Sequence, residues 1–213
     1  MRFAVIGLFG AYSVASAVSA VSACADAFSL GTTGAWAGAG FALLKVAVFA
    51  TFAVLVGVRP PAKQTNRDRV AIVACAAAFV SIALLQAPDA SEGGLAQLAG
   101  ELIAFAGMAW LFVSVLSLGR CFGVLPEARG LVTRGPYRLV RHPVYLGELA
   151  ACFGLTLAAP SARNLAVALA FAVAQAVRMR LEEQALSARF PEYADYSKRT
   201  PRLVPRLAFG SPG

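Results

Sequence analysis

A short polar stretch, VTRGPYRLVRHPVYLGE, interrupts an otherwise apolar chain between Val132 and Glu148. It contains His142, the only histidine in 213 residues, followed directly by Pro143 and three residues later by Tyr145. Because proline suits the first turn of a helix, we expect a helix to begin at Pro143 with His142 in the N-cap region. Free backbone N–H groups at that helix start favour an anionic ligand group. His142 and Tyr145 would share one face, and Glu148, one turn further on, is expected to face the same pocket. The alternative is that these side chains only anchor a helix end at the membrane interface.

A second polar cluster begins at Arg178, where the last apolar run ends. Glu182 lies four residues further on and shares the face of Arg178, whereas Glu183 lies about 100° round the helix. One interpretation is a simple ion pair between Arg178 and Glu182, worth ~0.2–0.5 kcal/mol. The other is that a short helical hairpin brings this cluster beside the first one, so that both contribute to a single pocket.

The elements that must position these side chains are long apolar runs. The sequence is 59% hydrophobic and only 14% charged, below the roughly 25% charged residues usual in soluble domains, and its mean hydropathy is +0.69. A membrane span needs about 20 apolar residues. The runs are 3–25, 34–58, 70–87 and 95–118, then the shorter 143–159 and 164–177. They predict an all-α integral membrane protein with about six transmembrane helices, the last two forming a C-terminal helical hairpin before a cytoplasmic tail.

Charge placement predicts the orientation. Basic residues gather in 59–69, in 120–141 and after Arg178, whereas the loops near Asp26 and at 88–94 are acidic. Because basic loops remain cytoplasmic, both termini and both polar clusters are expected on the cytoplasmic side. The net charge of +8 is then explained by topology and by contact with anionic membrane lipids, and a nucleic-acid partner is not expected. The first run, which ends in VSAC, also resembles a signal peptide, and its cleavage stays open.

Several classes of site are disfavoured by what the sequence contains. One histidine and four cysteines without CxxC spacing do not predict a metal site. No GxGxxG follows a strand pattern, which argues against a Rossmann nucleotide fold. Lys45 and Glu101 lie inside apolar runs, where charges are costly, and we expect them to pair. The chain changes character near Gly119, so residues 1–118 are predicted to be scaffold helices and residues 119–213 to carry the site.

Two segments in this order carry a resemblance to a known family: RGLVTRGPYRLVRHPVYLG and, after the hairpin, RMRLEEQALSARFPEYADYSKRTPRLVP. Together they resemble the isoprenylcysteine carboxyl methyltransferase family and its phospholipid methyltransferase relatives, over roughly residues 120–207. The resemblance implies that 119–213 is a methyltransferase core with an S-adenosyl-L-methionine pocket facing the cytoplasm. It also implies acceptors that reach the pocket from the membrane.

The resemblance further assigns residues to the cofactor. Glu182 suits the ammonium or hydroxyl groups, His142 and the helix start suit the carboxylate, and the tyrosine rings suit adenine or the sulfonium. The expected cofactor-binding residues are Arg129, Gly130, Leu131, Val132, Tyr137, His142, Pro143, Val144, Tyr145 and Glu182.

The expected catalytic residues are Arg178 and Glu148. For a carboxylate acceptor, Arg178 could supply a bidentate partner, and the function expected first is carboxyl O-methylation of an isoprenylcysteine-like or other lipophilic acceptor. An amine or thiol acceptor would need a base, for which Glu148 or His142 is suited. The alternatives are therefore an amino-phospholipid N-methyltransferase, a thiol S-methyltransferase, or a non-catalytic membrane scaffold. Arg129 replaces the histidine of eukaryotic members, and Glu148 stands where an uncharged residue is expected; both bear on the acceptor. The acceptor's identity and the oligomeric state are not indicated.

Overall fold

The computed structural model describes residues 2–58, 69–86, 94–121, 123 and 130–205. Within these ranges every regular element is a helix and none is a strand, which confirms the predicted all-α class. The elements are α1 (Arg2–Leu30), α2 (Thr33–Val58), α3 (Arg69–Leu84), α4 (Leu95–Leu118), η1 (Gly119–Cys121), η2 (Gly135–Arg138), α5 (Pro143–Ala158), α6 (Ala162–Arg189) and α7 (Tyr193–Arg199).

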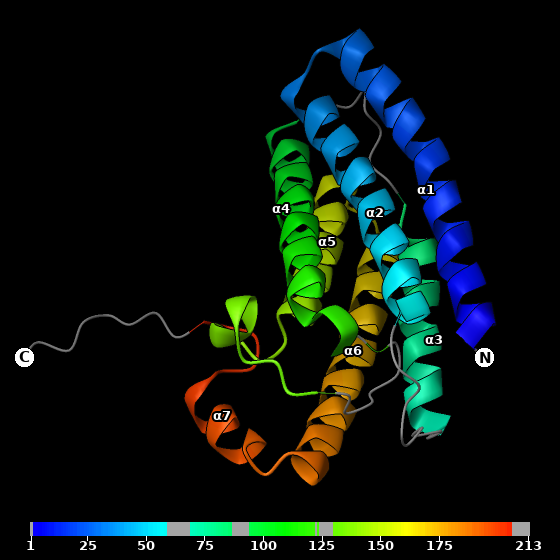
Figure 1. Ribbon diagram of the computed structural model, residues 1–213. Helices are drawn as coiled ribbons and strands as arrows, with labels where there is room; N and C mark the ends of the chain where they lie inside the picture. The colour runs from blue at the N-terminus through cyan, green and yellow to red at the C-terminus, as the bar shows by residue number, and fades with distance from the viewer. Residues whose placement is uncertain (1, 59–68, 87–93, 122, 124–129, 206–213) are drawn as a thin grey trace, which may run out of the picture.

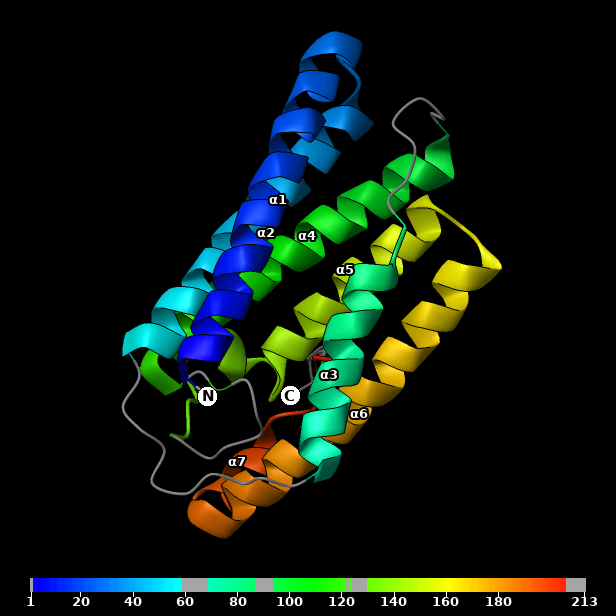
Figure 2. The same cartoon turned by 90° about the vertical axis from the view of Figure 1, so that its right-hand side faces the viewer.

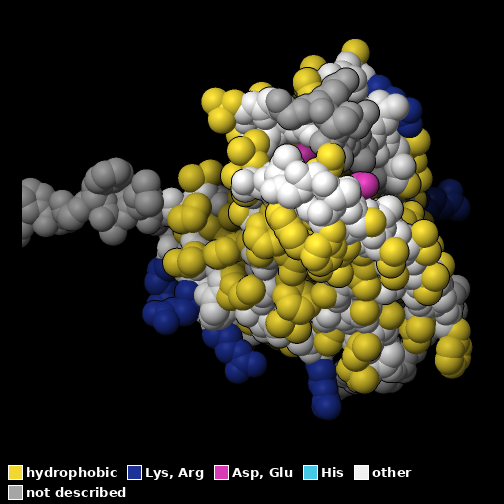
Figure 3. All heavy atoms as spheres, turned by 90° about the horizontal axis from the view of Figure 1, so that it is seen from above, with side chains coloured by type: hydrophobic (Ala, Val, Ile, Leu, Met, Phe, Trp, Pro, Cys, Tyr) yellow, Lys and Arg dark blue, Asp and Glu magenta, His cyan; other side chains and the backbone are white. Residues whose placement is uncertain are grey.

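The membrane-like character of the fold follows from helix length and from what the helices expose. Four helices, α1, α2, α4 and α6, are long and apolar enough to cross a membrane, and α3 and α5 are shorter apolar helices. Large side chains such as Phe3, Val18 and Leu169 are mostly exposed, which suits lipid rather than water. Seen from the end where α1 meets α2, much of the surface is hydrophobic and the basic side chains project from its edge (Figure 3). Each predicted apolar run is thus a helix, and the count of six spans stays a prediction.

The helices form a bundle in which neighbours in space are not always neighbours in the chain. α1 and α2 form one hairpin, α2 lies beside α4, and α4 lies beside α5 (Figure 1). The second view shows α3 alongside α6 (Figure 2). α3 also contacts the α1–α2 hairpin, since the ring centroids of Phe79 in α3 and Phe9 in α1 are 5.7 Å apart. The predicted C-terminal hairpin is present: α5 and α6 are joined by a short turn, and Ser161 caps α6 by accepting a hydrogen bond of 3.0 Å from the backbone N–H of Asn164.

Glycines allow the backbones of α4 and α5 to approach closely. A Cβ atom at Gly107 would lie 2.6 Å from the backbone nitrogen of Ala151, and one at Gly147 would lie 2.7 Å from that of Leu111. Small residues at such crossings are what holds helices together where lipid removes the hydrophobic driving force. The start of α5, which carries the first polar cluster, is therefore fixed against α4. The division of the chain at 118/119 remains a prediction.

The expected pair of Lys45 and Glu101 does not form, and that expectation was wrong. The Glu101 carboxylate instead accepts a hydrogen bond of 3.0 Å from Gln97 and lies against Gly34 of α2. Lys45 is eleven residues beyond Gly34 on the same helix, a rise of about 16 Å. Among the residues that the structure describes, no ion pair joins the two charges, because three helical turns separate their levels.

Candidate active site

The start of α5 places two of the predicted residues together. α5 begins at Pro143 with His142 at its N-cap, as the sequence predicts. The His142 ring is 2% exposed and lies edge-on to the Tyr145 ring, with 5.5 Å between the centroids. His142 does not cap the helix with its side chain; its Nε2 instead lies 3.0 Å from a carboxylate oxygen of Glu183. One ring nitrogen is therefore already engaged by the protein.

Glu182 faces the same pocket from α6. The Tyr145 hydroxyl donates a hydrogen bond of 2.9 Å to Glu182 Oε2, which joins α5 to α6 at this level. Glu182 lines an internal cavity, whereas the neighbouring Glu183 does not. The two adjacent carboxylates thus point to different surroundings, in keeping with their separation around the helix.

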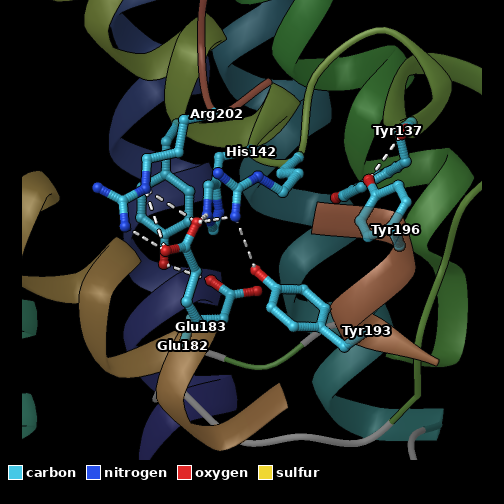
Figure 4. A network of polar contacts seen from close by, with 9 residues as sticks. Tyr137, His142, Glu182, Glu183, Tyr193, Tyr196 and Arg202 are labelled. Atoms are coloured by element: carbon cyan, nitrogen blue, oxygen red, sulfur yellow. Dashed lines mark hydrogen bonds and ion pairs between the residues drawn. The ribbon is translucent and has the colours of Figure 1, made fainter. Parts of the chain in front are cut away.

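Glu183 gathers charged side chains from three parts of the chain. Arg141 Nη1 lies 2.9 Å from Glu183 Oε1, and Arg202 donates to both carboxylate oxygens, one of these bonds from Nε at 2.9 Å. The backbone N–H groups of Arg141 and His142 donate to the carbonyl oxygens of Pro201 and Arg202, at 2.8 and 3.1 Å. Figure 4 shows this network around Glu183. The C-terminal segment, defined here as residues 190–205, is thereby folded back against the start of α5.

Two tyrosines of the C-terminal segment complete this end of the site. The Tyr196 hydroxyl donates a hydrogen bond of 2.6 Å to the backbone oxygen of Tyr137, and Tyr193 accepts one of 3.4 Å from Arg141 (Figure 4). Burial raises the pKa of both Tyr196 and Tyr137 above the usual range for a phenol. Hydrogen bonds to Glu183 raise the pKa of Arg202. The tyrosines are therefore neutral and the arginine charged at any physiological pH.

Arg178 lies deeper, in a cluster with Glu148 and Gln175. Its Nη1 donates a hydrogen bond of 2.7 Å to Gln175 Oε1 and lies 3.7 Å from Glu148 Oε2, while the Gln175 amide also bonds to Glu148. The guanidinium sits 5.0 Å from the centroid of the Tyr145 ring, a cation–π contact. Within the described residues Arg178 makes no ion pair with Glu182, so the sequence interpretation of a pair within α6 was wrong. The partner is on α5 instead, because the hairpin brings Glu148 alongside.

These side chains surround one cavity of about 440 Å³, a size typical of small-molecule sites, which run from ~300 to 1,000 Å³. Its polar end is defined here by Tyr137, His142, Tyr145 and Glu182, and its apolar interior by phenylalanines of α1, α2, α3 and α6 with Met108 and Leu111 of α4. Of the residues expected from the sequence, the cavity wall includes Gly130, Leu131, Val132, Tyr137, His142, Val144, Tyr145, Glu148, Arg178 and Glu182.

The cavity wall does not account for all of the expected cofactor-binding residues. Pro143 is buried and begins α5 without lining the cavity, and Arg129 lies outside the described residues. Conversely, the cavity wall includes Arg141, Tyr193 and Tyr196, to which the sequence analysis assigned no role. Both tyrosines belong to the second of the two segments that resemble the family, which could have marked them as candidates. Their place on the cavity wall becomes clear only in the structure, where the C-terminal segment folds back against the start of α5.

The lining fits S-adenosyl-L-methionine by its chemistry. The cofactor carries cationic groups, ribose hydroxyls and a carboxylate, and the polar end offers the Glu182 carboxylate, aromatic faces and a helix start. Arg178 Nε is buried and has no hydrogen-bond partner within the described part of the chain. Such an unsatisfied donor is costly unless something else occupies the cavity.

Comparison with known proteins finds one matching family model and several relatives. Residues 91–193 match the family model described as phospholipid methyltransferase. The cobalt-zinc-cadmium resistance protein CzcN of Cupriavidus metallidurans is 41% identical over 103 residues, 46% of this chain and 48% of that protein. The nickel-cobalt-cadmium resistance protein NccN of Alcaligenes xylosoxydans is 38% identical over an alignment of the same coverage.

A third relative carries an enzymatic name. Methanethiol S-methyltransferase 2 of Bradyrhizobium diazoefficiens is 42% identical over 84 residues, 38% of this chain and 32% of that protein. The chain spans about half the length of the first curated relatives it matches, and less of the third. The matched segment runs from just before α4 to the start of α7, and so contains both polar clusters. The resemblance predicted from the two motifs is confirmed: residues 91–193 match the phospholipid methyltransferase family model, and a protein named as a methyltransferase is among the relatives.

Proposed function

We propose that this protein is an S-adenosyl-L-methionine-dependent methyltransferase that modifies a lipophilic acceptor reaching it from the membrane. The observation that carries the proposal is the cavity, which is continuous from a polar end suited to the cofactor to an apolar interior suited to the acceptor. When bound, the cofactor supplies an electrophilic methyl group on a sulfonium. The protein's task is to hold the acceptor in line with that methyl group, and alignment of this kind can supply ~7–11 kcal/mol.

At the polar end, Tyr145 and Glu182 are the proposed centre of cofactor binding. Their hydrogen bond fixes the Glu182 carboxylate on the cavity wall, where it can accept from an ammonium or hydroxyl group. Tyr137 is held by Tyr196 of the C-terminal segment, which covers this end. Gly130 and Leu131 line the same part of the cavity, as the resemblance implies.

At the acceptor end, the Arg178–Glu148 pair bears on the choice of reaction. A carboxylate acceptor could bond to the unpartnered Arg178 Nε, which supports the carboxyl O-methylation expected first. However, Arg178 is already paired with Glu148 and Gln175, and a second carboxylate would lie beside the first. Glu148 on the cavity wall could instead take the proton of a thiol or amine. Thiol S-methylation is therefore the second candidate, and the similarity to a protein named methanethiol S-methyltransferase favours it.

We also propose that the polar end faces the cytoplasm. Arginines gather around the start of α5 and in the C-terminal segment, and basic segments remain on the cytoplasmic side. Reporter fusions at residues 61, 92 and 213 should read inside, outside and inside. An outside reading at Gly213 would contradict this orientation.

The proposed activity is tested by two measurements on the full chain in detergent. Calorimetry should show binding of S-adenosyl-L-methionine, and labelled cofactor should transfer its methyl group to at least one member of a panel of lipophilic carboxylates, thiols and amino-phospholipids. Release of methanol by mild base identifies a methyl ester and separates the carboxyl reaction from the others. Absence of cofactor binding would favour the non-catalytic scaffold.

A further inference from the structure

Lys45 stands on the cavity wall in the middle of α2, inside a membrane-spanning helix. Within the part of the chain that the structure describes, its ammonium has no hydrogen bond or ion pair with any other residue. An ionisable side chain at such a depth is costly, and those that occur usually face a cavity and serve a ligand. Lys45 therefore needs an explanation that its neighbours in the fold do not provide.

The packing of the helices shows how deep Lys45 lies. Val48, one turn after Lys45, packs in one hydrophobic cluster with Leu111 of α4. Leu111 in turn lies against Gly147 of α5, and Glu148 is the next residue. Lys45 and Glu148 are therefore at about the same level of the bundle, on two different walls of the cavity.

The other cations on the cavity wall are already neutralised. Arg178 pairs with Glu148, and Arg141 pairs with Glu183 at 2.9 Å. Among the described arginines and lysines that line the cavity, Lys45 alone lacks an acceptor. A negatively charged group that enters the apolar interior would therefore find its free counter-charge at Lys45.

The acidic residues on the wall do not pair with Lys45: Glu148 is paired with Arg178, and Glu182 accepts a hydrogen bond from Tyr145. Glu101 and Asp26 line the opposite end of the cavity, and Glu101 is bonded to Gln97. Eleven residues of helix, about 16 Å, separate Lys45 from Gly34, where the Glu101 carboxylate lies. Attraction over that distance is weak beside a contact pair.

We propose that Lys45 binds the negatively charged group of the methyl acceptor, so that the acceptor reacts as an anion attached to an apolar chain. The inference rests on the proposed function and names its acceptor class: a carboxylate or a thiolate. Lys45 lies outside residues 91–193, so it would set specificity from the part of the chain that the family does not match. Lys45 would thereby add a second cation beside Arg178, which the sequence analysis expected to bind an acceptor carboxylate.

Methyl transfer follows the same course for a carboxylate and for a thiolate acceptor. The acceptor oxygen or sulfur forms a bond to the methyl carbon of the donor while the carbon–sulfur bond breaks, and its electron pair remains on the donor sulfur as a neutral thioether. A carboxylate is already ionised at neutral pH and needs no base. A thiol first loses its proton, which Glu148, at the same depth, is placed to accept. Lys45 stabilises the thiolate until it reacts.

Binding of simple probes tests the proposal without relying on turnover. By calorimetry on the full chain in detergent, octanoate should bind about tenfold or more tightly than octanol or octylamine, as a charge-assisted bond predicts. Lys45→Met, which keeps the length and apolar stem of the side chain, should abolish this preference, and Lys45→Arg should retain it. Lys198→Met is the matched control, because it removes a lysine that is 75% exposed. Equal octanoate affinity in the wild type and in Lys45→Met would overturn the proposal.

A methyl-transfer assay then shows whether the acceptor is a carboxylate or a thiol. With labelled S-adenosyl-L-methionine, either octanoate or octanethiol should be methylated, with a KM raised about tenfold by Lys45→Met and cofactor affinity unchanged. An unchanged KM for the methylated probe would contradict the role of Lys45 while leaving the methyltransferase activity in place. If the wild type binds no cofactor, the proposed function fails, and the octanoate measurement still decides whether Lys45 is an anion site.

Discussion

The two ends of the cavity differ in how their charged groups are partnered. At the polar end, the Glu183 carboxylate is shared by Arg141, His142 and Arg202, which come from the approach to α5 and from the C-terminal segment. Each of these side chains pairs with another in the group, although Arg141 Nε, like Arg178 Nε, is buried without a hydrogen-bond partner among the described residues. This end of the molecule is built to hold its shape.

In the apolar interior the charged groups are sparse and incompletely partnered. Arg178 and Glu148 form one pair, Arg178 Nε has no partner among the described residues, and Lys45 has none either. Unsatisfied polar groups are most costly where the dielectric is low. We infer from this difference that the polar end holds the site in place, whereas the interior has charged groups without protein partners that can bind the acceptor.

The largest effect is expected at Glu183, because its removal leaves several cations without a partner. Removing one member of a buried pair typically costs ~3–5 kcal/mol, and the cost here is expected to be smaller because the Arg202 side chain is 48% exposed. Glu183→Ala should therefore release the C-terminal segment, seen as rapid cleavage by trypsin near Arg199 and Arg202. Asp195→Ala is the control: it breaks a pair whose side chains are about three-quarters exposed, which is worth ~0–1 kcal/mol. Equal protection of the segment in wild type and Glu183→Ala would show that Glu183 does not hold it.

The next effect is expected at Arg178, which belongs to the interior. Arg178→Ala should lower turnover about a hundredfold, the size of losing one charged transition-state partner, and leave cofactor affinity nearly intact. Arg178→Lys should rescue little, because lysine lacks the planar fork of donors that orients a carboxylate. Calorimetry with S-adenosyl-L-methionine and an initial-rate assay separate the two quantities. A loss of cofactor affinity as large as that in Glu182→Gln would assign Arg178 to the polar end instead.

A smaller effect is expected at Glu182, and it distinguishes two adjacent carboxylates. Glu182→Gln should weaken cofactor binding about tenfold, since a charge-assisted hydrogen bond is worth ~1.5–3 kcal/mol. The melting temperature should change little, because Glu182 has one hydrogen bond from Tyr145 and no ion pair within the described residues. Glu183→Gln should show the reverse pattern: a lower melting temperature and a smaller change in affinity per folded molecule. Equal losses of affinity in both variants would mean that the wrong carboxylate faces the cofactor.

The sequence was sufficient where local physics decides the structure. The apolar run 95–118 is α4 to the residue, and Pro143 begins α5 because proline is favoured there. The run that was expected to end at residue 25 continues to Leu30, since Asp26 and Ser29 are compatible with a helix once the neighbouring hairpin supports it. The all-α class and the hairpin follow from such patterns alone.

The sequence was not sufficient where the outcome depends on packing between distant segments. Spacing could show that Glu182 and Glu183 face different ways, yet it could not place Arg202 against Glu183, because that contact requires the C-terminal segment to fold back. An ion pair of Arg178 with Glu182 was one of two interpretations of their spacing, and the partner in the structure is Glu148 across the hairpin. We expected Lys45 to pair with Glu101 because both are charged residues in apolar runs. The sequence does not show that the two side chains lie at different depths in the bundle.

The smallest effect is expected at Tyr196, and it tests the polar end by its pH dependence. Tyr196→Phe removes one hydrogen bond to the Tyr137 carbonyl oxygen and should cost ~0.5–1.5 kcal/mol of unfolding free energy at pH 7. Because burial raises the pKa of Tyr196 in the folded protein, the folded state keeps the phenol proton that the unfolded state loses above about pH 10. The stabilising contribution of Tyr196 is therefore fully present below that pH and declines as the pH rises through it. Denaturant unfolding at pH 7 and at pH 10.5 should show the wild-type advantage over Tyr196→Phe narrowing at the higher pH, about where a free phenol ionises. Tyr12→Phe, in α1 and far from the C-terminal segment, is the control, and the same narrowing there would mean that the pH dependence does not arise from the bond between Tyr196 and Tyr137.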